Sequence, residues 1–315
     1  MRISGFSFAR NAVKLHYPIR EAVASALPLV DEFVVALGDC DPDDGTREAL
    51  ESLHSPKLRI LDTVWDLEAF PRGMEHAHQT DLAKAQCSGD WLLYLQADEV
   101  LHEADLPRIR ARCEALLHRD DIEALLLRYH HFWGDYAHEL RSHGWYREEI
   151  RIIRNRPEIH SWESAQSFRR IPQFDGRSYR NPEGSFKLRA ARADAAIYHY
   201  GWVRPPASMQ TKRQVFDRIH HGTEAAAARH AANAPVFDYG DLSRIPRFRG
   251  THPAVMAPRI AALDWQDQLR HGGGPPRSRG LVKHERLKYR LVSWLENRLF
   301  GGRTLWGFRN YELAE

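Results

Sequence analysis

Short apolar runs alternate with segments of helical character along the first third of the chain. The apolar runs lie at residues 3–8, 33–37, 58–61 and 91–95. The segments between them read as helices, and within residues 19–30 the apolar side chains recur on one helical face. Parallel strands need crossover connections, which are usually helical. The alternation therefore predicts an α/β fold built on a sheet.

The sequence changes in character after Asp121. Strands are expected at residues 122–134, 148–155 and 195–202, separated by loops rich in aromatic residues and arginine. Residues 205–233 read as one helix or a broken pair of helices, and we expect this region to extend the same sheet and to form a cleft beside it.

Composition limits the class of protein. Hydrophobic residues make up 43% and charged residues 28% of the 315 residues, which is typical of a globular protein. No apolar run approaches the ~20 residues of a membrane-spanning helix, and we expect no signal peptide. Three scattered cysteines fit a reducing cytoplasm, and a net charge of +3 is too small to indicate a nucleic acid partner.

Acidic residues follow three of the predicted strands. Asp39 follows the second strand, Asp62 the third, and Asp98 and Glu99 the fourth. Ligands of open α/β sheets bind at the carboxyl ends of strands, although acids there also serve as ordinary turn residues. Adjacent carboxylates repel unless a cation lies between them, and Mg²⁺ and Mn²⁺ prefer carboxylate oxygens. For Glu99, a solvent-facing helix N-terminus is the other interpretation.

Three stretches carry a family resemblance: "ISGFSFARN", "LPLVDEFVVALGDCDPDDGT" and "HAHQTDLAKAQCSGDWLLYLQADEVL". In order and spacing they resemble the nucleotide-binding half of a family 2 glycosyltransferase with the GT-A fold, over residues 1–107. The resemblance implies a Rossmann-like mixed sheet flanked by helices, and a nucleotide-sugar donor, with a UDP-sugar favoured. It divides the chain into a donor half, an acceptor half of the same catalytic domain and a helical C-terminal extension, at residues 1–121, 122–245 and 246–315.

The resemblance also assigns roles to residues on the donor side. Asp39 would contact the base of the donor, while Phe8 and Arg10 would line the nucleotide pocket. Asp98 would hold a divalent cation, Mn²⁺ or Mg²⁺, that bridges the diphosphate. Glu99 would lie near the sugar or the metal.

One position departs from the family pattern. Gln96 stands where the family often has a carboxylate, so this donor-binding position adds no charge to the metal site. His199 resembles a replacement ligand by its order in the chain, although it also fits a core histidine bonded to a backbone carbonyl. Arg204 and Lys212 follow it and can stabilise negative charge on a leaving diphosphate.

Sugar transfer also needs a general base for the acceptor hydroxyl. The resemblance makes Glu163, with His160 nearby, the first candidate, and Asp135 is the second. On its own, a loop glutamate such as Glu163 reads as an exposed acid. Four aromatic residues are suited either to stacking on a sugar or to packing, namely Trp133, Trp145, Tyr146 and Trp162.

The tail after the glycine- and proline-rich stretch 270–280 is basic. From Arg277 onward it carries nine Lys and Arg residues against four Asp and Glu residues. Within residues 281–300, leucines recur every four positions from Leu287 to Leu299. Such a stripe either packs on the catalytic domain or makes a peripheral contact with an anionic membrane at its cytoplasmic face.

The sequence therefore favours a cytoplasmic, inverting, metal-assisted glycosyltransferase that acts on a glycan or a lipid-linked acceptor of cell-surface polysaccharide. Inversion follows from the resemblance alone. A non-catalytic nucleotide- or glycan-binding protein is the main alternative. A protein that has lost catalysis would be expected to lack a metal-binding carboxylate, as at Gln96, and to lack a clear general base. A sugar-nucleotide nucleotidyltransferase is less favoured, because "FSFARNAVK" lacks the glycines of its phosphate loop.

Overall fold

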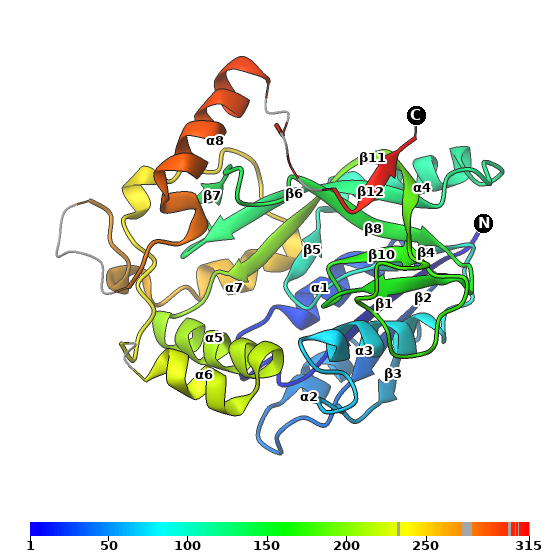
Figure 1. Ribbon diagram of the computed structural model, residues 1–315, viewed down its shortest axis with the longest axis horizontal. Helices are drawn as coiled ribbons and strands as arrows, with labels where there is room; N and C mark the ends of the chain where they lie inside the picture. Colours follow the sequence, from blue (N-terminus) through cyan, green and yellow to red (C-terminus); the bar gives the residue numbers. More distant parts are fainter. Residues whose placement is uncertain (232–233, 273–278, 302–303, 306, 308, 315) are drawn as a thin grey trace.

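One mixed β-sheet of twelve strands runs through the protein (Figure 1). The computed structural model describes residues 1–231, 234–272, 279–301, 304–305, 307 and 309–314. The main path of the sheet has the order β3-β2-β1-β4-β8-β6-β11-β10-β9. Beside this path, β5 and β12 pair with β11, and β7 pairs with β6.

The first part of the sheet is parallel. It consists of β1 (Ile3–Ala9), β2 (Glu32–Leu37), β3 (Leu58–Asp62) and β4 (Trp91–Tyr94). Side chains alternate between two core clusters: Phe33 and Val35 face one, whereas Val34 and Ala36 face the other. Both faces of β2 are buried, which explains why its sequence is a continuous apolar run.

The second part of the sheet is mixed. Its strands are β5 (Glu99–Leu101), β6 (Ala124–Trp133), β7 (Glu139–Leu140), β8 (Glu148–Arg154), β9 (Ile159–Trp162), β10 (Ser167–Arg170), β11 (Phe186–Trp202) and β12 (Tyr311–Leu313). β8 lies antiparallel between β4 and β6 and so joins the two parts into one sheet.

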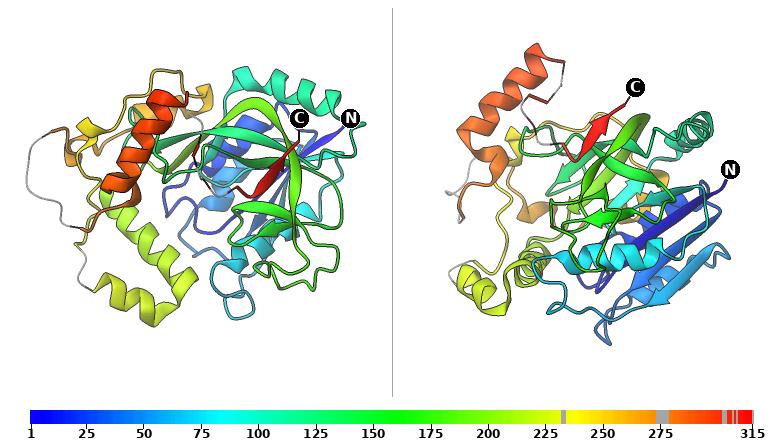
Figure 2. Two further views of the ribbon diagram at one scale, coloured as in Figure 1. Left: turned by 45° about the horizontal axis from the view of Figure 1, so that its top comes forward. Right: turned by 45° about the vertical axis from the view of Figure 1, so that its right-hand side comes forward.

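Helices cover both faces of the sheet (Figure 2). Val23 of α1 (Ile19–Ala26), Leu50 of α2 (Thr46–Glu51) and Ile109 of α4 (Leu106–Ala115) pack in one core cluster. Ala83 of α3 (Met74–Lys84) packs in the opposite one. The other α-helices within the described residues are α5 (Pro206–His221), α6 (Thr223–His230), α7 (Ala257–Ala261) and α8 (Leu287–Leu299).

The predicted fold class, an α/β protein with a mixed sheet flanked by helices, is confirmed, and the arrangement is consistent with the GT-A type. The stretch 205–233 forms the broken pair α5 and α6 rather than one helix, because Gly222 interrupts it with a φ of 84°. Positions 273–278 of the expected linker and 232–233 of the helical stretch lie outside the described residues. Among the helices that the structure describes, none has the length and apolarity to cross a membrane.

Candidate functional site

A cavity of about 700 Å³ opens at the carboxyl ends of β1 and β4. Phe8, Arg10 and Asp98 line it from the sheet side. Lys212 and Phe216 line it from α5. The volume is in the range of small-molecule sites, and the position is where open α/β sheets bind ligands. This cavity is therefore the candidate site.

One part of the cavity wall is aromatic. The ring of Phe8 stacks on His76 with centroids 5.4 Å apart, and the indole of Trp65 lies 6.0 Å from Phe8. The guanidinium of Arg10 lies over the Trp65 ring at 5.4 Å. Burial lowers the pKa of His76 to about 3, so its ring is neutral at physiological pH. Together these groups offer flat surfaces suited to a planar ring.

Asp39 is exposed and lies outside the cavity lining, next to this wall. Its carboxylate accepts hydrogen bonds from Arg10 Nη2 at 2.9 Å and from the Trp65 backbone N–H at 3.0 Å. Of these residues, Arg10 and Trp65 line the cavity. The structure thus gives Asp39 the role of orienting the two residues of the aromatic wall, and its expected contact with a base stays a prediction.

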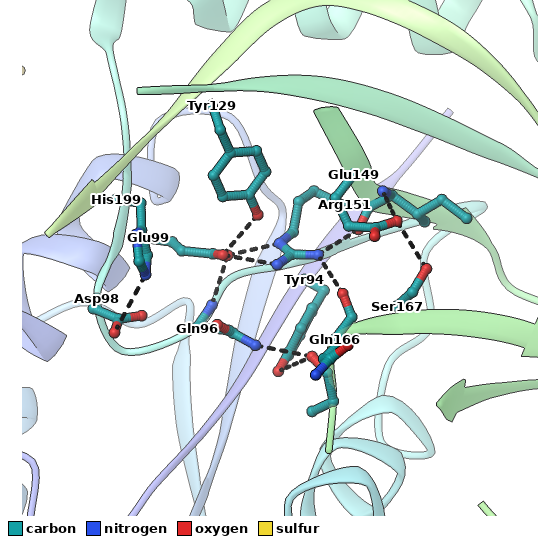
Figure 3. A network of polar contacts seen from close by, with 12 residues as sticks. Tyr94, Gln96, Asp98, Glu99, Tyr129, Glu149, Arg151, Gln166, Ser167 and His199 are labelled. Carbon is teal, nitrogen blue, oxygen red and sulfur yellow. Dashed lines mark hydrogen bonds and ion pairs between the residues drawn. The ribbon is translucent and has the colours of Figure 1, made fainter. Parts of the chain in front are cut away.

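The adjacent acids Asp98 and Glu99 point in different directions (Figure 3). Glu99 is fully buried, and Arg151 donates to both of its carboxylate oxygens at 2.7 and 2.8 Å. The Tyr129 hydroxyl and the Gln96 backbone N–H donate two further bonds, at 2.6 and 3.1 Å. Each oxygen of Glu99 therefore has two donors.

This pairing corrects the expected role of Glu99 as a ligand of the metal or the sugar. A buried carboxylate that is held by a bidentate arginine neutralises that arginine and anchors the chain. Glu99 therefore fixes the turn that carries Asp98. The Gln96 side chain contributes to the same turn, since its amide donates to the Ala165 carbonyl at 2.8 Å.

Asp98 is buried and faces the cavity. Its Oδ2 lies 3.7 Å from His199 Nε2 and 3.8 Å from Lys212 Nζ. Burial alone would raise the pKa of Asp98, but His199, Lys212 and Arg204 outweigh it and hold the pKa below its ordinary value. Asp98 is thus a carboxylate aimed at the ligand space.

A chain of hydrogen bonds sets the tautomer of His199. His131 Nε2 lies 2.8 Å from the Tyr146 carbonyl, which only accepts, so His131 Nε2 carries the proton. Burial lowers the pKa of His131 well below its usual range, so its Nδ1 is an acceptor. His199 Nδ1, 3.0 Å away, must then donate. His199 Nε2 then points toward Asp98 Oδ2, 3.7 Å away. Burial lowers the pKa of His199, while the charge of Asp98 opposes this shift.

Gly201 keeps the space between these two acceptors open. A Cβ at this position would lie 2.5 Å from Asp98 Oδ2 and 2.6 Å from His199 Nε2. Both distances are shorter than side-chain atoms tolerate, so a larger residue here would have to displace Asp98 or His199. A carboxylate oxygen and an imidazole nitrogen that face one glycine-lined space are a donor set for a cation when the imidazole is neutral.

A divalent cation fits these residues as a two-point anchor. Mg²⁺ and Mn²⁺ commonly take one or two protein ligands and complete their shell with water and phosphate oxygens. Within the described ranges, no group of three or more His, Cys, Asp and Glu side chains forms a metal cage. The cation expected from the sequence therefore agrees with Asp98 and His199 only if the ligand supplies further oxygens.

The two basic residues differ in their access to the cavity. Lys212 lines it, and its ammonium donates to the Gly201 carbonyl at 2.7 Å. Burial, together with the charge of Arg204, lowers the pKa of Lys212 to about 7. Arg204 is fully buried behind the wall, where it lies over the Tyr17 ring at 4.4 Å and donates to the Gly201 carbonyl at 3.1 Å. The expected direct contact of Arg204 with the donor is therefore not supported.

The two candidate bases also differ. Asp135 is buried, and its Oδ1 accepts bonds from the backbone N–H groups of Ala137 and His138 and contacts His138 Nδ1 at 2.8 Å. It lies outside the cavity lining and holds a turn, which corrects its expected role as a base. Glu163 is also absent from the cavity lining, but it is half-buried and lies next to Ser164, a lining residue, in the turn between β9 and β10.

The aromatic residues considered for sugar stacking mostly pack. Trp133 and Trp162 are buried, and Trp162 lies under Arg169 at 5.0 Å. His160 contacts Asp81 at 2.8 Å, away from the cavity lining. Tyr146 is exposed but is absent from the lining.

Several site residues escaped the sequence analysis. His131 and Arg151 act on His199 and Glu99 from strands β6 and β8. The available signal was a charged or polar residue at a buried position of each apolar strand, which implies a buried partner. The aromatic wall residues Trp65 and His76 carried no comparable signal.

No protein-family model matches the chain, and no curated protein matches it. Among solved structures, glucosyl-3-phosphoglycerate synthase from Mycobacterium tuberculosis in complex with Mn²⁺, uridine diphosphate and phosphoglyceric acid is 20% identical, with a TM-score of 0.29. That match covers 41% of this chain and 43% of that chain. S. aureus TarS is 14% identical, with a TM-score of 0.39, over 72% of this chain and 41% of that chain. The structure of S. aureus TarS 1–349 is 15% identical, with a TM-score of 0.35, and the match covers 73% of this chain and 72% of that chain.

The chain therefore spans less than half the length of the first two of these structures. At identities and TM-scores this low, the similarities carry no argument about activity.

Proposed function

We propose that the protein is a glycosyltransferase that moves a sugar from a nucleotide-sugar donor, with a UDP-sugar favoured, to a hydroxyl of a glycan or lipid-linked acceptor. One observation carries the proposal. A single cavity joins the aromatic wall of Phe8, Trp65 and His76 to the Asp98–His199 pair, which Gly201 keeps open. The aromatic wall suits the planar base of a nucleotide, and the Asp98–His199 pair suits a diphosphate with its cation.

The chemistry follows from the residues. Asp98 and His199 would hold a divalent cation, Mn²⁺ or Mg²⁺, whose charge would stabilise the leaving diphosphate. Lys212, 3.8 Å from Asp98 and on the cavity wall, would bind a phosphate oxygen as a point charge. Glu163 would accept the proton of the acceptor hydroxyl, and inversion at the anomeric carbon would follow from a single displacement. We place the reaction in the cytoplasm.

Donor hydrolysis tests this proposal. The wild-type protein should release nucleoside diphosphate from a UDP-sugar when Mn²⁺ is present, and Asp98→Asn should slow the release by at least ~100-fold. Asp62→Asn is the matched control, because Asp62 follows β3 in the same way but lies outside the cavity lining and pairs with Arg47. Its rate should equal the wild-type rate.

Two other results would contradict the proposal. Tight binding of UDP-sugars with no release, even with candidate acceptors, would favour a non-catalytic binding protein. Release of pyrophosphate from a nucleoside triphosphate and a sugar phosphate would identify a nucleotidyltransferase.

A further inference from the structure

The helix α8 is docked on the protein by its polar side. Glu296 is fully buried and contacts His143 Nδ1 at 2.7 Å and Arg147 Nη2 at 3.1 Å. The Ser293 hydroxyl accepts from the His143 backbone N–H at 2.8 Å, and the Asn297 amide donates to the Arg141 carbonyl at 3.0 Å. These contacts place the polar residues of α8 on the loop between β7 and β8.

The apolar side of α8 consequently faces outward. Leu287, Leu291 and Trp294 are 78%, 58% and 57% exposed. Their spacing of four and three residues puts them on one helical face. Leu299 and Phe300, at 63% and 47% exposure, continue the apolar surface at the end of the helix. A helix of a soluble protein normally buries this face, so the interpretation that the leucine stripe packs on the catalytic domain is not supported.

The flanks of this face are basic. Arg286, Lys288, Arg290 and Arg298 are all exposed. The only acidic residue within α8 is Glu296, which is buried and paired on the opposite side. The outward surface of α8 therefore combines leucine, tryptophan and cations without a compensating acid from the helix itself.

We propose that this outward face of α8 binds the surface of an anionic lipid membrane. Leu287, Leu291 and Trp294 would enter the boundary between headgroups and acyl chains, where tryptophan is favoured. The four cations would contact lipid phosphates, each contributing about fivefold to binding near an anionic surface. Charge complementarity selects a membrane over an apolar protein groove, because a groove would have to neutralise all four cations. In Figure 1 and in the right-hand view of Figure 2, α8 lies at the outer edge of the molecule.

One loop connects this surface to the candidate site. Ser142 and His143 contact α8, and three residues later the Tyr146 carbonyl accepts from His131, the partner of His199. A membrane-bound α8 would thus hold the cavity at a fixed relation to the lipid surface, which suits a lipid-linked acceptor. The link to a lipid-linked acceptor rests on the proposed function, whereas membrane binding by α8 does not.

Vesicle co-sedimentation of the full chain tests the inference. The wild-type protein should bind vesicles that contain phosphatidylglycerol and not vesicles of phosphatidylcholine alone, and added salt should weaken the binding. Trp294→Glu should lower the bound fraction by at least ~10-fold. Phe186→Glu is the matched control, because Phe186 is 50% exposed on β11, outside the cavity lining, and its change should have no effect. Arg290→Gln and Arg298→Gln should each lower the affinity for phosphatidylglycerol vesicles about fivefold.

The comparison of the two lipids on the wild-type protein needs no variant, so a variant that fails to fold does not block the test. Equal binding to both vesicle types would overturn the inference, as would binding of folded Trp294→Glu at the wild-type level. A wild-type dimer that Trp294→Glu dissociates, with no vesicle binding, would instead identify a protein interface. None of these measurements uses a donor, so their failure is separate from failure of the proposed activity.

Discussion

Asp98 and Glu99 illustrate how neighbouring identical charges acquire different roles. Glu99 is neutralised by Arg151 in the core, so its charge is not available to a ligand. Asp98 faces the cavity with His199 and Lys212 beside it. Each of the two adjacent acids therefore has its own basic neighbour, Arg151 for Glu99 and Lys212 for Asp98, which reduces the repulsion expected between them. Asp98 is then the single carboxylate left to bind a cation. Gly201 is important because the absence of a side chain there leaves space for a cation next to Asp98.

Gly201→Ala tests the open space directly. The added methyl group would lie within 2.6 Å of both Asp98 Oδ2 and His199 Nε2, so it would occupy the space between them and displace one or both side chains without removing either. We expect the affinity for Mn²⁺, measured by electron paramagnetic resonance with UDP present, to fall by at least ~10-fold, with a stability loss of about 1–3 kcal/mol. Gly280→Ala is the control, since a Cβ there meets no atom within 4 Å. Wild-type Mn²⁺ affinity in Gly201→Ala would show that the cation lies elsewhere.

Glu75 predicts a pH dependence of stability. This carboxyl group is buried in α3, and burial raises its pKa to about 7. The folded state therefore binds the proton more tightly than the unfolded state, whose pKa is near 4.5. Its favourable contribution is complete below pH 4.5 and is lost as the pH rises through 7.

Glu75→Gln removes this loss. Relative to the wild-type protein, the variant should gain up to about 3 kcal/mol in unfolding free energy on going from pH 5 to pH 8, as measured by urea denaturation. An identical stability difference between variant and wild type at both pH values would mean that Glu75 does not titrate in this range.

At the scale of elements, the turn between β9 and β10 connects the sheet to the cavity. Glu163 and Ala165 have φ values of 57° and 60°, an uncommon conformation for residues other than glycine. Ser164 between them lines the cavity, and the Ala165 carbonyl accepts from Gln96. Two left-handed residues held in one turn next to a ligand space suggest a functional constraint.

Glu163→Gln tests the role of this turn in proton transfer. The variant should bind the donor with wild-type affinity, and its transfer rate should fall by at least ~100-fold. Glu183→Gln, an exposed loop position outside the cavity lining, is the control and should behave as wild type. A wild-type transfer rate in Glu163→Gln would assign the base to another residue.

The elements that the sequence predicted well are those with local patterns. β1, β2 and β4 appear as continuous apolar runs because both of their faces are buried. β3 lies at the edge of the sheet and is only partly buried, and its run is interrupted by Arg59. The short strands β5, β7 and β12 have two or three residues, too few for a period to be recognised.

The details of the site depend on long-range partners. Arg151 is 52 positions from Glu99, and His131 is 68 positions from His199. No local pattern links such residues, so the role of Glu99 could not be predicted. The orientation of α8 was open for the same reason: its leucine stripe is visible in the sequence, but the loop that binds its opposite side is not.

At the scale of the whole molecule, the cavity depends on both parts of the sheet. The parallel part supplies Phe8, Arg10 and Asp98, and the later part supplies His199 from β11 and Lys212 from α5. β8, between β4 and β6, fixes the two parts relative to each other and also carries Arg151. The strand that joins the sheet is therefore the one that fixes the Asp98 turn.

The central claim is that this cavity binds a nucleoside diphosphate through a cation on Asp98 and His199. Calorimetric titration of the wild-type protein and Asp98→Asn with UDP, with and without Mn²⁺, tests it most directly. We predict that UDP binds the wild-type protein at least ~10-fold more tightly with Mn²⁺ than without it, and that Asp98→Asn loses this difference. UDP affinity that neither Mn²⁺ nor Asp98→Asn changes would contradict the claim.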